Sequence, residues 1–473
     1  MKAGAIAVLV LCALSGCAVG PDYRRPEVQI AAAYKEAGEW KTAQPQDDLD
    51  RGKWWGVFGD PRLDALVEQV EISNQNVRVA EAQFRRARAL AAASSAATFP
   101  TLDADASVVR SRSPTGVIGG TTAGRIITNR SASFNAGWEA DLWGRLRRAV
   151  ESSEASAQAS AADLAAARLS AQAELASNYF QLRILDAQKQ LLEDTVAAFQ
   201  KSLDLTRNRY DAGVAAKVDL VQAETQLKST QAQAIDTGVQ RAQLEHAIAV
   251  LIGKTPAEFS IAPVPLAVTM PRVPVGLPSE LLERRPDIAA AERRVAAANA
   301  QIGVAKAAYF PSLTLSASYG SRSADASQWF SAPSRFWSIG PALAQSIFDA
   351  GLRRAQTEQA IAAYDATVGE YRQAVLAGFQ EVEDNLAALR ILEEEAKVQD
   401  DAVRAARESV TLTTNQYKAG TVSYINVVTV QTTQLNNERT AVGILGRQLV
   451  AAVTLVRALG GGWSAAEMAA DNR

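Results

Sequence analysis

The residues best suited to chemistry stand near the N-terminus. Cys17 follows Ser15-Gly16, and an apolar run over residues 3–14 precedes them. Small residues directly before a cysteine, at the end of such a run, are typical of the site where a lipoprotein signal peptide is cleaved. The expected chemistry is attachment of lipid to the Cys17 thiol; an ordinary signal peptide with an incidental cysteine is the alternative. Ala18 stands in place of the aspartate that favours retention in the inner membrane.

The rest of the chain offers no pattern of residues for catalysis or metal binding. Its one histidine, His246, is expected on a helix surface or in packing, and Cys12 lies within the leader, which leaves the mature chain no cysteine pair. The sequence contains no Cys/His cluster, nucleophile motif or phosphate-binding glycine loop. A net charge of −2 over 473 residues argues against a nucleic-acid partner. These observations predict a protein that is not an enzyme and needs no cofactor or metal.

Four segments alternate between apolar and polar residues with a period of two, at about 101–110, 131–142, 312–320 and 336–347. Each approaches the roughly nine to eleven residues that a tilted strand needs to cross a bilayer. A soluble antiparallel sheet would alternate in the same way. Gly/Ser/Thr-rich loops between paired segments and aromatic residues near strand ends favour the membrane. The polar faces carry the carboxylates Asp103, Asp105, Glu139 and Asp141, which are expected to line water. Four strands cannot close a membrane barrel, so three chains are expected to share twelve.

Two long helices are expected at 144–210 and 352–417, with return helices at 218–252 and 425–459. The first long segment contains no proline and no glycine after Gly144, and a helix of this length spans about 100 Å. Apolar residues with 4-3 spacing along it, mostly alanines, predict a coiled-coil seam. A plain soluble coiled coil is the alternative to the wall of a periplasmic tube.

The chain is internally duplicated. Leu146-Arg147-Arg148-Ala149 recurs as Leu352-Arg353-Arg354-Ala355, and similar echoes run through both halves. The duplication predicts a first repeat at 61–253 and a second at 281–460, joined by a Pro-rich connector at 254–280. A signal peptide at 1–16 and an extended, lipidated arm at 17–60 precede the repeats, and a tail at 461–473 follows them.

Several motifs together resemble the outer membrane factors, the TolC-like proteins, and in particular their lipidated OprM/NodT branch. The resemblance rests on 281–288 (Leu-Leu-Glu-Arg-Arg-Pro-Asp-Ile), Ala291-Glu292, Ile302-Gly303, Phe310-Pro311 and 17–23 (Cys-Ala-Val-Gly-Pro-Asp-Tyr). It implies an α+β membrane protein that forms a homotrimer in the Gram-negative outer membrane, with a twelve-stranded β-barrel continued by a twelve-helix periplasmic tunnel.

For function, the resemblance implies a passive exit duct for drugs or other small molecules that couples to a periplasmic adaptor and an inner-membrane RND-type pump. A duct for type I protein secretion is one alternative. A coiled-coil scaffold or adhesin without a pore is another, and it belongs to a different functional class.

Two groups of candidate site residues follow. Aromatic and basic side chains where strands meet helices are expected to contact outer membrane lipids, although simple solvation of the helix is an alternative for the arginines. They are Trp143, Arg145, Arg147, Arg148, Phe348, Arg353 and Arg354.

By resemblance, the turns between long and return helices border a constriction that stays shut until adaptor and pump dock. The candidates there are Tyr210, Asp219, Tyr417, Asn426 and Thr429. The alternative for Asp219 is that it caps or decorates the return helix. TolC carries carboxylates in its second repeat where this chain has Asn426 and Thr429, so weaker cation selectivity is expected.

Overall fold

The computed structural model describes residues 18–31, 33–36, 53–112, 126–264, 270–271 and 284–463. The expected signal peptide, Cys17, much of the connector and most of the tail lie outside these described residues. The chain divides into two compact units. Unit 1 consists of the described residues within 1–27, 84–160 and 291–371. Unit 2 consists of the described residues within 28–83, 161–290 and 372–473. Each unit therefore combines pieces of both sequence repeats.

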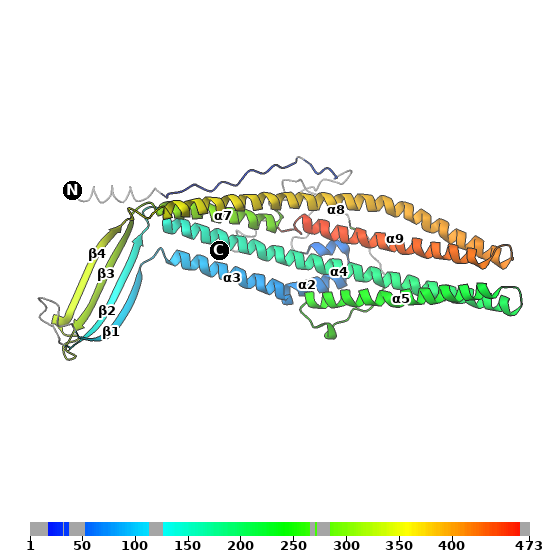
Figure 1. The fold of residues 1–473 in the computed structure, drawn as a ribbon, viewed down its shortest axis with the longest axis horizontal. Coiled ribbons are helices and arrows are strands. Elements are labelled where there is room, and N and C mark those ends of the chain that lie inside the picture. The colour runs from blue at the N-terminus through cyan, green and yellow to red at the C-terminus, as the bar shows by residue number, and fades with distance from the viewer. Residues whose placement is uncertain are drawn as a thin grey trace. The chain divides into compact units, whose positions relative to one another are not determined.

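Unit 1 contains a four-stranded antiparallel sheet in the order β1-β2-β3-β4 (Figure 1). The strands are β1 (Thr101–Arg112), β2 (Ile126–Ala140), β3 (Ser312–Ser323) and β4 (Arg335–Ala344). Because β2 pairs with β3, the two repeats are joined in one sheet. Strand β2 begins five residues before the expected start at about 131.

The register places the predicted apolar residues on one face of this sheet. One row across the four strands is Ala104, Phe134, Tyr319 and Trp337, and the next is Leu102, Ala136, Ala317 and Ile339. Trp337 is 72% exposed and Ile339 76% exposed. The single chain thus leaves a broad apolar face uncovered.

The opposite face of the sheet is polar and cross-linked by side chains. The hydroxyl of Ser107 lies 2.8 Å from that of Ser131, and Asn135 donates to Asp105 at 2.7 Å. Such cross-strand pairs stabilise a sheet. One face therefore suits hydrocarbon and the other suits water.

The two longest helices match in length, as a duplication requires. Helices α4 (Arg145–Asp211) and α8 (Leu352–Lys418) each have 67 residues, and the return helices α5 (Lys217–Leu251) and α9 (Tyr424–Ala458) each have 35. These bounds lie within one residue of the expected ends. The shorter helices are α2 (Pro61–Ser73), α3 (Gln75–Ala96) and α7 (Pro286–Ala307).

The end of the N-terminal arm differs from the extended segment that the sequence predicted. Residues Trp54–Phe58 form the 3-10 helix η1, and Trp54 is buried with its indole donating to Gln172 at 3.1 Å. The ring of Phe58 packs on Phe180, with centroids 4.8 Å apart. Large aromatic residues gain too much from burial to remain on an exposed arm, so they anchor it in unit 2.

The residues that follow the two return helices of unit 2 lie against the backbone at the end of α2 and just before α7, which explains two of the repeated glycines. Gly253 and Gly460 adopt left-handed backbone conformations, with φ of 67° and 93°. A Cβ at Gly253 would collide with the backbone of Ser73, and one at Gly460 with that of Arg284. Only glycine combines this conformation with so close an approach.

Helix α9 is the most apolar long helix that the structure describes. By length and composition it could cross a membrane, with a mean hydropathy of 1.4 over its most apolar stretch, yet 56% of that stretch is buried within the protein. Leu449, Val453 and Val456 are all at most 1% exposed. Burial inside a helical assembly accounts for this hydropathy.

Candidate gate at the helix turns

The two turns between long and return helices share one backbone design. Gly213 and Gly420 have φ of 73° and 78°. Gly213 N–H donates to the Tyr210 carbonyl at 2.9 Å, and Gly420 N–H donates to the Tyr417 carbonyl at 3.0 Å. This is the left-handed helix cap that Gly favours. The turns contact each other, because the Arg209 guanidinium donates to the Lys418 carbonyl at 3.0 Å.

Directly behind the turns, four helices of unit 2 form a buried apolar cluster, here called the turn cluster. Its members are Phe199, Leu203, Ala223, Leu227, Tyr417, Tyr424 and Val427. The rings of Tyr417 and Tyr424 meet edge to face with centroids 5.3 Å apart, and the Arg209 guanidinium lies 4.9 Å from the centre of the Tyr417 ring. These aromatic and cation–π contacts hold the two turns together.

Burial is the main cause that raises the pKa of Tyr424, to about 12, and the charges of Tyr417 and Asp219 add to it. The Tyr424 hydroxyl also hydrogen-bonds with the side chain of Thr206. Tyr424 is therefore uncharged at neutral pH and contributes as an apolar ring with one satisfied hydroxyl.

The gate candidates differ in their surroundings. Tyr417 is 4% exposed within the turn cluster, whereas its repeat counterpart Tyr210 is 38% exposed. Asn426 and Thr429 are exposed on α9. Thr429 donates to the carbonyl of Ile425 at 2.9 Å, and Asn426 donates to Ser423 at 3.3 Å.

Asp219 is half-buried in the first turn of α5, but it is not the N-cap. Ala216 occupies the cap position and makes no side-chain cap bond. Capping by Asp219 is thus wrong, although a carboxylate in this turn still favours the helix dipole. Tyr424, Arg209 and Thr206 were missed by the sequence analysis. One feature of the sequence could have indicated Tyr424. The equivalent position of the first repeat is Lys217, so the aromatic residue at this point is particular to the second turn.

At the junction of β2 and α4, the predicted membrane-interface residues form close contacts within unit 1. Trp143 stacks on Phe310 with centroids 4.7 Å apart and donates to the Pro311 carbonyl at 2.8 Å. Arg145 makes two bonds to Glu139, at 3.0 and 2.7 Å. The backbone N–H of Arg147 donates to Asp141 at 2.8 Å. The carboxylates of Glu139 and Asp141 therefore fix the positions of Arg145 and Arg147.

Arg148 lies differently from the other candidates. Its side chain is 8% exposed and bonds to Asp22 at 3.0 Å and Glu151 at 2.8 Å. Burial removes it from contact with lipid, because its guanidinium is already committed inside unit 1.

The corresponding junction of the second repeat is more open. Phe348 is 88% exposed. Arg353 bonds to Asp349 and lies over the ring of Tyr309, and Arg354 bonds to Glu358 at 3.0 Å. Phe348 is thus accessible to a membrane surface, and both arginines are paired with nearby carboxylates.

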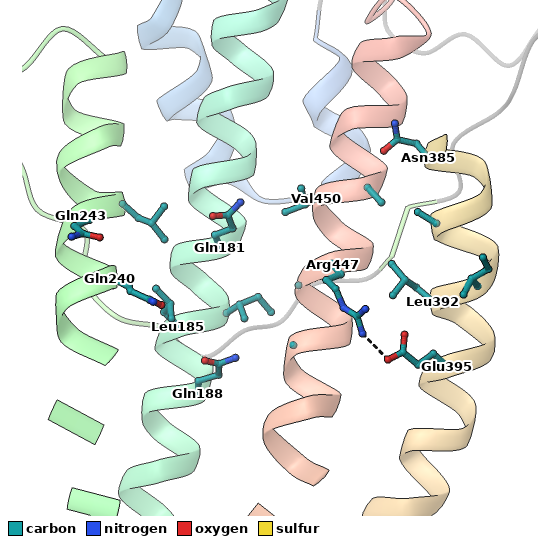
Figure 2. A pocket seen from close by; sticks show the side chains of 17 residues that line it. Gln181, Leu185, Gln188, Gln240, Gln243, Asn385, Leu392, Glu395, Arg447 and Val450 are labelled. Carbon is teal, nitrogen blue, oxygen red and sulfur yellow. Dashed lines mark hydrogen bonds and ion pairs between the residues drawn. The ribbon is translucent and has the colours of Figure 1, made fainter. Parts of the chain in front are cut away.

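A cavity of about 1070 Å³ lies among α4, α5, α8 and α9 of unit 2 (Figure 2). Glutamine amides and aliphatic side chains share its lining, and the Glu395–Arg447 ion pair, at 2.7 Å, lies on one side. Gly443 also lines the cavity, and a Cβ at this position would meet no other atom, so the cavity is open beside it. The size and mixed lining suit a small organic molecule. The described residues include no group of three His, Cys, Asp or Glu side chains that could hold a metal, and His246 is exposed on α5.

Comparison with known proteins places this architecture in context. The family model described as outer membrane efflux protein matches residues 66–254 and 277–461, one stretch in each repeat. The probable efflux pump outer membrane protein TtgC of Pseudomonas putida is 32% identical over 454 residues, covering 95% of this chain and 93% of the relative. The pyoverdine export outer membrane protein OpmQ of Pseudomonas aeruginosa is 32% identical over 432 residues, covering 90% and 91%.

Solved structures agree with these relatives. The outer-membrane channel OprN superposes with a TM-score of 0.89 at 33% identity, over 94% of this chain and 100% of that one. The open state of the Neisseria gonorrhoeae MtrE outer membrane channel gives a TM-score of 0.83 at 28% identity, over 94% and 98%.

Proposed function

The chain belongs to the outer membrane efflux protein family and is the outer membrane channel component of an efflux system; we propose that three copies close into one passive exit duct. In this trimer, twelve strands form the barrel and twelve helices form the periplasmic tunnel, three times the four strands of the sheet and the four long helices per chain.

The observation that carries the proposal is the sheet of unit 1. Strands β1 and β4 are its edges, and neither has a further partner among the described residues. One face is apolar and exposed along all four strands. A lipid-facing sheet cannot keep open edges, and four strands are too few to curl into a membrane barrel. Pairing of β4 with β1 of the next copy removes both edges.

Unit 2 offers independent support, because two of its helices carry uncovered coiled-coil stripes. On α8, Ile391, Val398, Ala405 and Leu412 follow each other at intervals of seven residues and are exposed. On α5, the stripe is Val218, Val221, Ile235 and Val239. Val398 is 71% exposed and Ile235 78% exposed. Seven-residue apolar spacing calls for a partner helix, which a neighbouring copy supplies.

The two stripes lie at the same height along the helices when the turn before α5 of one copy is placed level with the turn after α8 of the next. Ile235 stands eighteen residues after the first residue of α5, and Val398 stands twenty before the last of α8. At about 1.5 Å per residue, both lie roughly 30 Å from their turns. We expect Ile235 of one copy to lie near Val398 of the next.

A cysteine pair tests this arrangement. The mature chain has no cysteine besides Cys17, so Ile235→Cys with Val398→Cys introduces the only free thiols. Oxidation of membranes from cells expressing this variant should give covalent dimers and trimers and no larger species. Asp236→Cys with Val398→Cys, one residue off the stripe, is the matched control and should cross-link poorly. Equal yields from both pairs, or a ladder beyond three, would contradict a closed trimer.

The cargo is inferred from the relatives. Relatives of this chain are named for efflux of antibiotics, toluene or solvents, or for export of pyoverdine. We therefore assign small organic molecules to this duct, delivered by an inner-membrane RND-type pump through a periplasmic adaptor. The turn cluster is the element we assign to the closed gate. Deletion of the gene should sensitise cells to hydrophobic compounds, and restoration should require an intact pump.

A further inference from the structure

One end of the sheet in unit 1 carries a pattern of charge that the pore and the gate do not use. Helices α3, α4, α7 and α8 each connect to the same end of the strands, so the connections β1–β2 and β3–β4 lie at the other end (Figure 1). In the proposed duct the helices belong to the periplasmic tunnel. The end with the two connections, here called the outer end, therefore faces the cell exterior.

Four arginines at the outer end continue the apolar face of the sheet. Every second residue of a strand lies on the same face, and Ala104, Phe134, Tyr319 and Trp337 form one row of the apolar face. Steps of two residues from this row toward the outer end reach arginines on three of the strands. They are Arg110 and Arg112 on β1, Arg130 on β2 and Arg335 on β4, here called the arginine band.

The two faces of the sheet differ in the sign of their charges. No carboxylate lies on the apolar face of the four described strands, whereas Asp103, Asp105 and Glu139 all lie on the polar face. One strand arginine, Arg322, lies on the polar face, with its guanidinium 5.3 Å from the centre of the Phe336 ring. The apolar face is therefore charged only at its outer end, and only positively.

Three members of the arginine band have no partner within the described part of the chain. The side chains of Arg110, Arg112 and Arg335 make no hydrogen bond or ion pair there, and all three residues are exposed. The segment 113–125, which connects β1 to β2, contains no Asp or Glu in its sequence. These three guanidinium groups are therefore available to an anion from outside the chain.

The fourth member, Arg130, is held by the connection between β3 and β4. It donates to the Ala324 carbonyl at 3.0 Å, and its charge interacts with that of Asp325. The Asp325 carboxylate is itself bound by the backbone N–H and the hydroxyl of Ser327, at 2.9 and 2.8 Å. One carboxylate thus acts on one of the four arginines, and the band keeps an excess of positive charge.

Aromatic side chains indicate where the band lies relative to the membrane. Phe134, Tyr319 and Trp337 are neighbours in one row of the apolar face, and all three are exposed. On the lipid-facing side of a barrel, aromatic residues gather at the level of the head groups. Arg335 stands two residues beyond Trp337, and Arg130 four beyond Phe134, which is roughly 7 and 13 Å along the strands. The band therefore starts at the head groups and continues outward.

We propose that the arginine band binds the phosphates of the phosphorylated glycolipid of the outer leaflet, lipopolysaccharide, at its lipid A head group. Guanidinium forms strong, bidentate hydrogen bonds with phosphate. A phosphate that is joined to acyl chains matches both properties of this face, because the acyl chains lie along the apolar rows while the phosphates meet the arginines. A soluble anion would use only the charge.

The trimer of the proposed function completes the site, and this part of the proposal rests on it. Strands β1 and β4 are the edges of the sheet. When β4 pairs with β1 of the next copy, Arg335 of one copy and Arg110 and Arg112 of the next lie at the outer end of two paired strands. Each seam between copies then combines arginines from two chains, and the band continues around the whole barrel.

Retention of lipid A by the purified full-length protein in detergent tests the proposal, with native mass spectrometry counting the lipid A bound to each assembly. The band variant combines Arg110→Gln, Arg112→Gln, Arg130→Gln and Arg335→Gln. For a matched pair of single changes, Arg335→Gln is compared with Arg322→Gln, which removes an arginine from the polar face at the same end of the sheet. Lipid A without phosphates is the control ligand, and inorganic phosphate is the competitor.

Wild-type assemblies should retain lipid A, and the band variant should retain about five-fold less, because the charge-assisted bonds to phosphate are lost. Arg335→Gln alone should lower retention about two-fold, whereas Arg322→Gln should leave it unchanged. Lipid A without phosphates should bind the wild type as weakly as intact lipid A binds the band variant. Millimolar inorganic phosphate should not displace lipid A from the wild type.

Equal retention by the wild type and the band variant would overturn the proposal. Equal losses from Arg335→Gln and Arg322→Gln would overturn it too, because the face that carries the charge would not matter. Displacement of lipid A by millimolar phosphate would show a site for any phosphate and contradict the assignment to a glycolipid. If the band variant does not assemble, Arg110→Gln and Arg335→Gln, each compared with Arg322→Gln, decide the question.

Failure of the exit-duct proposal would look different. A protein that retains lipid A as expected but conducts no ions would contradict the duct and leave the arginine band as a lipid site. Assemblies with the mass of a single chain that still lose lipid A in the band variant would contradict the trimer alone. Normal conductance with equal lipid A retention in the wild type and the band variant would contradict only the lipid site.

Discussion

The ring of Tyr417 at the end of α8 packs edge to face on the ring of Tyr424 at the start of α9, with centroids 5.3 Å apart. This pair closes one helix turn onto the buried turn cluster. The first repeat has no such pair, because Tyr210 is largely outside the cluster and Lys217 stands where Tyr424 would be. The two turns are alike in backbone but not in packing.

Removing the Tyr424 ring should loosen the closed turns. Tyr424→Ala leaves a cavity in the turn cluster, and loss of a buried aromatic ring costs about 3 kcal/mol or more. We expect reconstituted liposomes with this variant to lose trapped calcein at least ten-fold faster than those with the wild type. Tyr210→Ala, at the exposed counterpart, is the control and should leak at nearly the wild-type rate. Asp219→Ala should act in the same direction as Tyr424→Ala.

Asn426 should set the weak ion preference of the gate. It is exposed near the turn, so a carboxylate there would appear three times around the aperture of a trimer. Asn426→Asp should therefore shift the reversal potential in a KCl gradient toward that of potassium. Thr440→Asp, about 21 Å farther along α9, adds the same charge away from the gate. Equal shifts from both variants would show that the position of the charge does not matter.

The glycines that end the return helices should be intolerant of alanine. Gly460→Ala forces a side chain into the backbone of Arg284 and strains a left-handed residue. We expect a loss of more than 1 kcal/mol in the free energy of unfolding, seen as a lower thermal midpoint. Gly238→Ala, in the open middle of α5, should instead be neutral or slightly stabilising.

Arg147 and Arg353 are proposed to meet phosphates of the inner leaflet beside the strands. Replacing both with glutamate should reduce barrel insertion and heat stability, because like charges then face the lipid head groups. Urea extraction of outer membranes measures the inserted fraction. If insertion and heat stability remain at wild-type levels, these arginines serve only helix solvation and their ion pairs with Asp141 and Asp349.

Much of the fold could be predicted because its elements obey simple periodicities. A strand between lipid and water must alternate, so Leu313–Tyr319 revealed which residues share a face, although β3 runs to Ser323, three residues beyond the expected end at about 320. The long helices lack strong breakers, so their ends could be placed from Gly213 and Gly420. Strand β2 began earlier than expected because residues 126–130 lie beyond the clear alternation.

The contacts that hold residues Ala18–Tyr23 to unit 1 could not be predicted, although several of these residues were noticed. Gly20-Pro21-Asp22-Tyr23, Ala291-Glu292 and Ile302-Gly303 each contributed to the resemblance, but nothing local indicates that they touch. Tyr23 and Glu292 are 269 residues apart. A buried Arg148 and an exposed Arg354 likewise arise from identical Leu-Arg-Arg-Ala motifs. Tertiary neighbours, not local sequence, decide between those two environments.

Conductance across a planar bilayer distinguishes a shared pore from a scaffold without a pore. Purified wild-type protein and Tyr424→Ala should be added in parallel to bilayers under voltage. We expect discrete conductance steps from both, with rare and brief openings of the wild type and prolonged openings of the variant. If neither protein gives a current above that of a protein-free bilayer, the chain forms no pore and a scaffold without a pore is favoured.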